Sequence, residues 1–228
     1  MLCQFTVKNF KSIRDEATFD MQAAAISEHE DRIIIDKDEK KYLPVSAIYG
    51  PNGGGKSNVL AALHTLVAKV LRPLFATEDS EEKVLLQKKL IVEPFAFSQS
   101  KDGSTEFELF FRTTVSEYRY ILHVKRDIVL YESLDRVKLE TGRKSALFTR
   151  DENGIILKGA FAKLKVSNEL SKTLTLLSYL GIAYKGNAVV KDVLSWFEYG
   201  IEFLNYGNPI QELRMAVSTS EEVKQLML

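Results

Sequence analysis

The stretch from Ala47 to Leu63, "AIYGPNGGGKSNVLAAL", contains a motif with a direct physical meaning. Gly50, four intervening residues and then Gly55, Lys56 and Ser57 follow the pattern G-x-x-x-x-G-K-[ST] without a mismatch. Glycines let such a loop curl so that successive backbone N–H groups point inward at an anion, and the helix that follows adds the positive end of its dipole. The stretch therefore predicts a phosphate-binding loop.

The pattern also assigns a role to each side chain of the loop. The lysine reaches the β- and γ-phosphates of a nucleoside triphosphate, and the hydroxyl after it binds the Mg²⁺ that bridges them. We therefore predict that Lys56 is the catalytic residue, that Ser57 is the metal ligand, and that ATP and Mg²⁺ are the cofactors. The glycines that complete the predicted nucleotide site are Gly50, Gly53, Gly54 and Gly55.

The segments on either side of the loop have the expected character. Residues 42–50, "YLPVSAIYG", are apolar without alternation, which predicts a strand buried on both faces. After the loop, apolar side chains recur at helical spacing and predict an amphipathic helix that stops at Pro73. With strand, loop and helix in register, a chance match of a glycine-rich turn is the weaker alternative.

Most of the remaining chain alternates polar and apolar residues with a period of two. Residues 3–10 and 16–22 predict a hairpin, and residues 32–36 predict a short strand at the surface. An antiparallel meander is predicted from about residue 90, with strands in the segments 90–99, 105–114, 117–126, 127–137 and 145–159. Helical spacing returns in 168–203, with helices predicted over 169–181, ending at Gly181, and over 187–204.

These patterns predict an α/β fold of the P-loop NTPase class with an antiparallel β subdomain and a helical C-terminal portion. We expect a nucleotide-binding core over residues 1–75, the β subdomain over 76–165, and a helical segment over 166–228 that continues into a further lobe.

Composition narrows the function classes. Lys and Arg together equal Asp and Glu, at 31 each, so no whole-chain field attracts nucleic acid or an anionic membrane. Cys3 is the only cysteine, which excludes an internal disulfide and a cysteine-based zinc site. We expect a cytoplasmic protein without a membrane partner.

Other P-loop classes are weaker interpretations. No guanine-reading N-K-x-D is present, and Asp151–Gly154 matches D-x-x-G only within a predicted Asn-Gly hairpin turn. Hydrolysis calls for an apolar strand after the loop that ends in Asp-Glu, but Asp36 precedes the loop and has no acid beside it. Glu93 and Glu132 are single acids, which we interpret as solvent-facing strand residues. A small-molecule kinase is disfavoured by the long meander.

Two stretches together show a resemblance to a known family. Residues 5–21, "FTVKNFKSIRDEATFDM", followed by residues 46–63, "SAIYGPNGGGKSNVLAAL", resemble the N-terminus of ABC-type ATPases of the SMC, RecF and OLD group. The chain looks most like the prokaryotic stand-alone branch often labelled "AAA family ATPase", which is frequent in phage-defence operons. The resemblance is specific over the first 70 residues and covers the later strands more loosely.

The resemblance implies further site residues. It places Lys11 and Ser12 of the "NFKS" turn beside the phosphates, Asn52 at the γ-phosphate side, and Asn58 in the nucleotide-binding set. It leaves Gln87 and Gln99 as candidates for the glutamine that senses the γ-phosphate. The signature loop, the acidic strand and the switch histidine of the family have no match here; "ELSKT" at 169–173 lacks the signature glycine and is interpreted as a plain helix.

Two functions remain open from the sequence. The first is the ATP-binding N-terminal portion of an ABC-type ATPase, in anti-phage defence or a DNA-linked process, which hydrolyses ATP weakly alone and pairs with a second copy or a partner lobe. The second is a nucleotide-gated module that docks an effector protein such as a nuclease or toxin. Nucleic acid is a possible partner by family analogy only.

Overall fold

A computed structural model of the protein describes residues 1–25, 30–75, 90–97, 103–167 and 170–203. Its centre is a seven-stranded sheet in the order β2-β1-β5-β6-β7-β8-β9, in which all neighbours pair antiparallel. The strands are β1 (Leu2–Lys8), β2 (Ala17–Asp20), β5 (Thr105–Arg112), β6 (Ser116–Lys125), β7 (Ile128–Lys138), β8 (Lys144–Asp151) and β9 (Gly154–Leu157). The predicted hairpin of residues 3–10 and 16–22 and the later strands of the predicted meander are confirmed.

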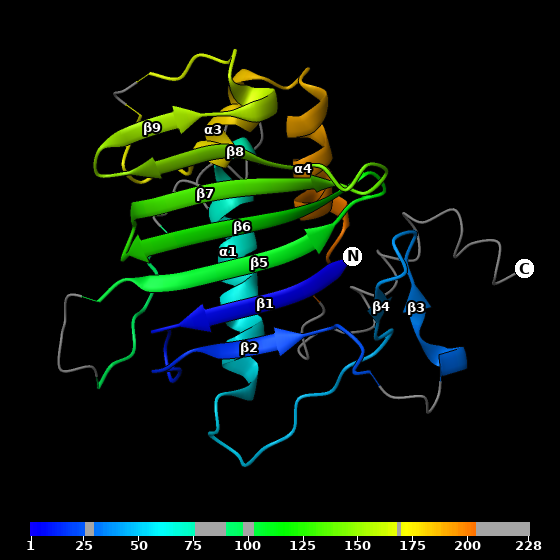
Figure 1. Ribbon diagram of the computed structural model, residues 1–228. Helices are drawn as coiled ribbons and strands as arrows, with labels where there is room; N and C mark the ends of the chain where they lie inside the picture. The colour runs from blue at the N-terminus through cyan, green and yellow to red at the C-terminus, as the bar shows by residue number, and fades with distance from the viewer. Residues whose placement is uncertain (26–29, 76–89, 98–102, 168–169, 204–228) are drawn as a thin grey trace, which may run out of the picture.

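Helices cover one face of this sheet, as Figure 1 shows. They are α1 (Lys56–Phe75), α3 (Leu176–Ala183) and α4 (Ala188–Tyr199), with short 3-10 helices η1 (Glu30–Arg32) and η2 (Gly159–Phe161). A separate small hairpin consists of β3 (Ile34–Ile35) and β4 (Lys41–Tyr42). Strands β1 and β2, from the predicted nucleotide-binding core, therefore share one sheet with β5 to β9, from the predicted β subdomain. The division of the chain into three parts stays a proposal.

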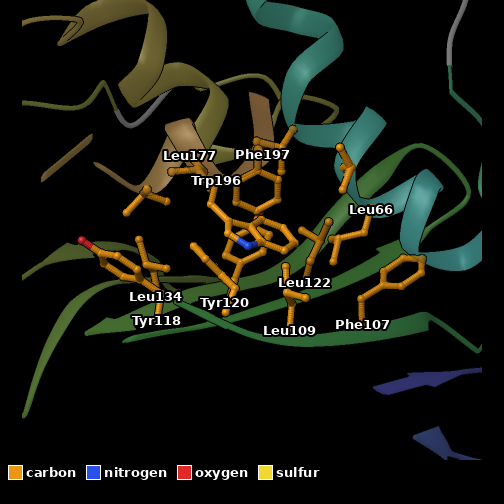
Figure 2. Packing of buried hydrophobic residues seen from close by; sticks show 14 of the residues in the cluster. Leu66, Phe107, Leu109, Tyr118, Tyr120, Leu122, Leu134, Leu177, Trp196 and Phe197 are labelled. Atoms are coloured by element: carbon orange, nitrogen blue, oxygen red, sulfur yellow. The ribbon is translucent and has the colours of Figure 1, made fainter. Parts of the chain in front are cut away.

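The core lies between the helices and the inward face of the sheet. Alternate residues of β5 and β6 point inward because strand side chains alternate between the two faces. They meet Leu66 of α1 and Trp196 and Phe197 of α4, as Figure 2 shows. The inward aromatic and leucine residues of the two strands are Phe107, Leu109, Phe111, Tyr118, Tyr120 and Leu122.

Helix α1 runs across the sheet from the predicted phosphate loop (Figure 1). It is long and apolar enough to span a membrane by length and composition alone, and it packs its buried face against the core. The predicted stop at Pro73 is wrong, because α1 continues to Phe75. Proline removes only one hydrogen bond this close to a helix end, and Leu74 lies close against Gly181 of α3.

Two predicted strands are absent. Residues 90–97 form no strand because their backbone is bonded elsewhere: the Val92 N–H donates to the carbonyl of Arg126 at 2.8 Å. In residues 42–50 only Tyr42 belongs to a strand, and Val45 and Tyr49 are 78% and 89% exposed. A strand buried on both faces needs two neighbours, and the described part of the chain supplies none beside this segment.

Helix α3 begins later than the pattern predicted. Residues 170–175 are not helical, so the helix predicted over 169–181 is wrong in its first half. Thr175 is the N-cap and accepts a hydrogen bond from the Ser178 N–H at 3.1 Å, which fixes the start. Gly181 lies inside the helix, where an added Cβ would lie 2.6 Å from side chains of α1 and α4, so tight packing rather than termination accounts for this glycine.

Glu132 of β7 is fully buried, so its predicted solvent-facing position is wrong. Its carboxylate accepts the backbone N–H groups of Leu176 and Leu177 at 2.6 and 2.9 Å and the hydroxyl of Tyr120 at 2.9 Å. Burial raises the pKa of Glu132, and these hydrogen bonds oppose that shift. The carboxylate thus attaches the N-terminus of α3 to the sheet, where the helix dipole favours a negative charge.

Arg112, at the end of β5, attaches the β3–β4 hairpin to the sheet. It is only 2% exposed and binds Asp36 at 2.7 Å, Asp38 at 2.6 Å and Glu117 at 2.6 Å. These hydrogen bonds lower the pKa of Asp36 and bring that of Asp38 to about 2. Because Tyr42 packs its ring under the guanidinium at 5.1 Å, the network also fixes the chain where it leaves the hairpin toward the predicted loop.

Replacing Glu132 tests the carboxylate cap. Glu132→Ala leaves two helix N–H groups and a buried hydroxyl without an acceptor, so we expect the free energy of unfolding to fall by about 3 kcal/mol. Urea denaturation followed by circular dichroism measures this. The control is Glu152→Ala, in the exposed β8–β9 turn, with a change within about 0.5 kcal/mol. Equal effects of the two variants would show that Glu132 does not support α3.

Candidate functional site

The predicted phosphate loop ends directly on a helix N-terminus. Helix α1 starts at Lys56, so the N–H groups of its first turn point toward the loop. Gly53 and Gly55 adopt the left-handed region with φ of 79° and 85°. The Gly54 N–H donates to the Pro51 carbonyl at 3.1 Å, which closes the turn. A glycine-rich turn on the positive end of a helix is a site for an anion.

The Lys56 ammonium lies over this loop. Its Nζ donates to the backbone carbonyls of Gly50 and Pro51, both at 2.7 Å. Phosphate oxygens would be stronger acceptors for this cation than neutral carbonyls, because a hydrogen bond between two charged groups is the stronger kind. Asn52 and Ser57 are both exposed at the loop, so the hydroxyl proposed as the Mg²⁺ ligand is accessible.

The turn between β1 and β2 touches the phosphate loop. Asn58, in the first turn of α1, donates through Nδ2 to Oγ of Ser12 at 2.6 Å. Gly55 lies against the same hydroxyl, since a Cβ added to Gly55 would lie only 2.9 Å from Oγ. The structure therefore brings together Ser12, Gly55 and Asn58, three of the predicted site residues. Asn58 meets the β1–β2 turn and thereby positions it.

Lys11 is held in an unusual backbone conformation next to this contact. Its φ is 49°, and its N–H donates to the carbonyl of Glu93 at 3.0 Å. The ammonium extends over the ring of Phe10, with Nζ 5.6 Å from the centroid. The Lys11 side chain is otherwise exposed, one residue from the Ser12 hydroxyl.

Asn9 supports the turn and was not among the predicted site residues. Its φ is 55°, a left-handed value that asparagine tolerates better than most residues. Its side chain accepts the Phe95 N–H and donates to the Ser104 carbonyl, both at 3.0 Å. Asparagine in a turn is the sequence signal that could have indicated this role, whereas its two partners are remote in sequence.

Three of the other acids considered from sequence serve structural contacts, and the fourth, Glu93, is exposed and lies outside any strand. Asp36 binds Arg112, Glu132 caps α3, and Asp151 accepts the Asn153 N–H at 2.8 Å in the β8–β9 turn, as expected for an Asn-Gly hairpin. The described residues contain no group of three or more His, Cys, Asp or Glu side chains that could hold a metal. Gln87 and Gln99, the two candidate sensors of the γ-phosphate, lie outside the described residues.

The groups present at the loop fit a magnesium nucleotide. The loop offers backbone N–H groups and an ammonium as hydrogen-bond donors to a triphosphate, and a hydroxyl oxygen as a ligand for Mg²⁺. Glycine at position 54 lets the turn of the loop close tightly, since a Cβ there would lie 3.0 Å from the Pro51 carbonyl oxygen.

Comparison with known families agrees with this geometry. Residues 45–188, more than half of the chain, match the family described as "AAA domain, putative AbiEii toxin, Type IV TA system". No curated protein matches the chain. The match begins just before the phosphate loop and ends at the start of α4, so it includes the loop, α1, the meander and α3. The predicted α/β fold of the P-loop NTPase class is confirmed.

Replacing Gly55 tests the contact between the turn and the loop. Gly55→Ala imposes a left-handed conformation on a residue with a Cβ and presses that Cβ on the Ser12 hydroxyl. We expect a loss of about 2 kcal/mol in the free energy of unfolding by urea denaturation, of which Ser12→Ala in the same chain restores part. The control is Gly186→Ala, with open space at the Cβ position. An effect of Gly55→Ala no larger than that of the control would contradict the close contact.

Proposed function

Because the chain belongs to this family of AAA domains, we propose that it binds Mg²⁺-ATP at the loop of residues 50–57. The observation that carries the proposal is the position of the loop: it ends on the N-terminus of α1, and Lys56 already lies over it, bonded to two loop carbonyls. Such a site attracts a triphosphate through both the helix dipole and a fixed positive charge.

The residues of the loop would share the work of holding the nucleotide. Lys56 neutralises charge on the β- and γ-phosphates, the N–H groups of Gly53–Ser57 bind phosphate oxygens, and the Ser57 hydroxyl ligates Mg²⁺. When bound, Mg²⁺ would supply positive charge that offsets the charge of the phosphates. Lys11 and Asn52 are proposed as further contacts to the phosphates, and Ser12 as a group that Asn58 orients beside them.

Within the AAA domains we propose a finer placement, in the SMC, RecF and OLD group of ABC-type ATPases. The support is the β1–β2 turn, whose Ser12 hydroxyl binds Asn58 next to the loop. In that group the turn of the same sequence lies beside the nucleotide phosphates. The seven-stranded antiparallel sheet would then be the first lobe of the complete ATPase.

We also propose that a further lobe of the same ATPase covers the segment before the loop. Val45 and Tyr49 are largely exposed although the segment reads as a buried strand. Glu132 and Asp36 are engaged in structural contacts, so neither orients the attacking water, and we expect that group to come from the further lobe. The chain alone would bind ATP and hydrolyse it weakly.

The exposed segment also favours a second function, in which ATP gates the docking of a partner. The family description names a toxin of a toxin–antitoxin system, which makes a defence role with a toxin or nuclease effector reasonable to test. In this case ATP changes self-association or partner capture without turnover. We propose homodimerisation, nucleic-acid binding and a cytoplasmic location as well.

Titration calorimetry with Mg²⁺-ATP tests the site. Lys56→Ala removes charged hydrogen bonds to the phosphates, so we expect the affinity to fall at least about tenfold. The control is Lys185→Ala, an exposed lysine between α3 and α4, with unchanged affinity. Equal affinities of the two variants would contradict the site.

Hydrolysis by the same proteins tests whether the chain needs another lobe. We expect phosphate release by the wild-type chain close to the uncatalysed background, because the strand acids Asp36 and Glu132 are bound in structural contacts and the proposed further lobe is absent from the assay. Fast turnover that Lys56→Ala abolishes would contradict the need for a further lobe, although ATP binding would stand.

A further inference from the structure

A few residues of the chain have a backbone conformation that only surrounding contacts can maintain. In the described ranges, the non-glycine residues with a left-handed φ are Asn9 at 55°, Lys11 at 49°, Glu39 at 65° and Arg126 at 60°. This region is unfavourable for residues with a Cβ, and it persists where the surrounding structure holds it. Such residues gather at functional sites, so the contacts that hold them point to function.

Two of these residues, both in the β1–β2 turn, bind the same short segment. The carbonyl of Glu93 accepts the Lys11 N–H at 3.0 Å. The Phe95 N–H donates to Oδ1 of Asn9, also at 3.0 Å. We call residues 92–95 the brace, because its backbone bonds the turn at two points.

The other end of the brace is fixed to the core and to α1. The side chain of Val92 is only 1% exposed, and its N–H donates to the carbonyl of Arg126 at 2.8 Å. Arg126 is a third left-handed residue, and the next residue, Asp127, accepts a hydrogen bond at its carbonyl from the buried Lys69 ammonium at 2.8 Å. Lys69 belongs to α1, so the brace connects the β1–β2 turn to the helix that begins at the phosphate loop.

Asn9 is also bonded to the start of β5. Its Nδ2 donates to the Ser104 carbonyl at 3.0 Å, and the hydroxyl of the buried Thr105 donates to the Asn9 carbonyl at 2.6 Å. Both polar atoms of the side chain and the backbone carbonyl are therefore engaged. These bonds fix the base of the β1–β2 turn between the brace and the sheet.

The fixed turn presents two residues at its tip. Phe10 and Ile13 exchange backbone hydrogen bonds at 2.8 and 2.7 Å, so only Lys11 and Ser12 lie between them. Ser12 accepts the hydrogen bond of Asn58 at the start of α1, at 2.6 Å. The backbone of Lys11 is therefore held at three places, by the brace, by the closed turn and by the neighbouring contact to α1.

We propose that Asn9 and the brace are positioning elements for Lys11, which they hold so that its ammonium meets the nucleotide phosphates. The inference rests on the proposed ATP site. A lysine side chain has many rotamers, and ordering it on binding costs affinity, so a backbone that is already fixed at its base reduces that cost. Asn9 acts through Lys11 and not on the phosphates themselves.

A double-mutant cycle with Mg²⁺-ATP in titration calorimetry tests this role. Lys11→Met keeps the length of the side chain and removes its charge, and we expect about tenfold weaker binding. Asn9→Gly keeps a residue that adopts the left-handed φ and removes both side-chain hydrogen bonds, and we expect about fivefold weaker binding. In the Lys11→Met background, Asn9→Gly causes no further loss, because the charge that it positions is gone.

A second variant and a control keep the test independent of stability. Thr105→Val removes the hydrogen bond to the Asn9 carbonyl at nearly constant volume, and we expect the same dependence on Lys11. The matched control is Asn153→Gly, an exposed asparagine in the β8–β9 turn, which leaves the ATP affinity unchanged. Circular dichroism establishes that each variant is folded before titration, and Thr105→Val carries the test if Asn9→Gly does not fold.

The outcomes separate this inference from the proposed function. Unchanged ATP affinity in Asn9→Gly and Thr105→Val overturns the positioning role. An equal loss with and without the Lys11 charge also overturns it, because the two residues would then support the site as a whole. If Lys11→Met binds ATP as the wild type does while Lys56→Ala weakens it, the inference fails and the phosphate site stands. If Lys56→Ala has no effect, the proposed function itself fails.

Discussion

The contact between the Ser12 hydroxyl and the first turn of α1 joins the phosphate loop to the antiparallel sheet. On one side of the contact is the phosphate loop, whose glycines set its curvature. On the other is an antiparallel sheet that carries the β1–β2 turn at its edge. Because Asn58 bonds Ser12 at 2.6 Å and Gly55 leaves no room for a side chain there, the turn and the loop keep one relative position. The proposed nucleotide contacts of Lys11 and Ser12 depend on that position.

The rest of the fold keeps the two sides of this contact in place. Helix α1 packs along the inner face of the sheet, so the start of the helix stays beside the turn. Glu132 attaches α3 to the same face, and α3 in turn packs against the end of α1 at Gly181. Arg112, the last residue of β5, binds the β3–β4 hairpin. The chain leaves that hairpin toward the loop. Buried polar groups therefore fix both the entry to the loop and the helix that leaves it.

The features that the sequence predicted well are those set by neighbours along the chain. The loop pattern, the period-two strands and the helical spacing after Ser57 each depend on a few consecutive residues, and the corresponding elements are present. The errors concern pairing across the fold. Glu132 looked like an exposed strand residue because its partners, the N–H groups of α3, lie more than 40 residues later. Residues 42–50 looked buried because an apolar run signals burial without naming the element that covers it.

A crystal structure of the chain with Mg²⁺ and a non-hydrolysable ATP analogue tests the central claim most directly. We expect Lys56 Nζ to leave the Gly50 and Pro51 carbonyls for phosphate oxygens, while the Ser12–Asn58 contact stays intact. An analogue bound away from the loop, with Lys56 still on the two carbonyls, would show that the loop is not the nucleotide site.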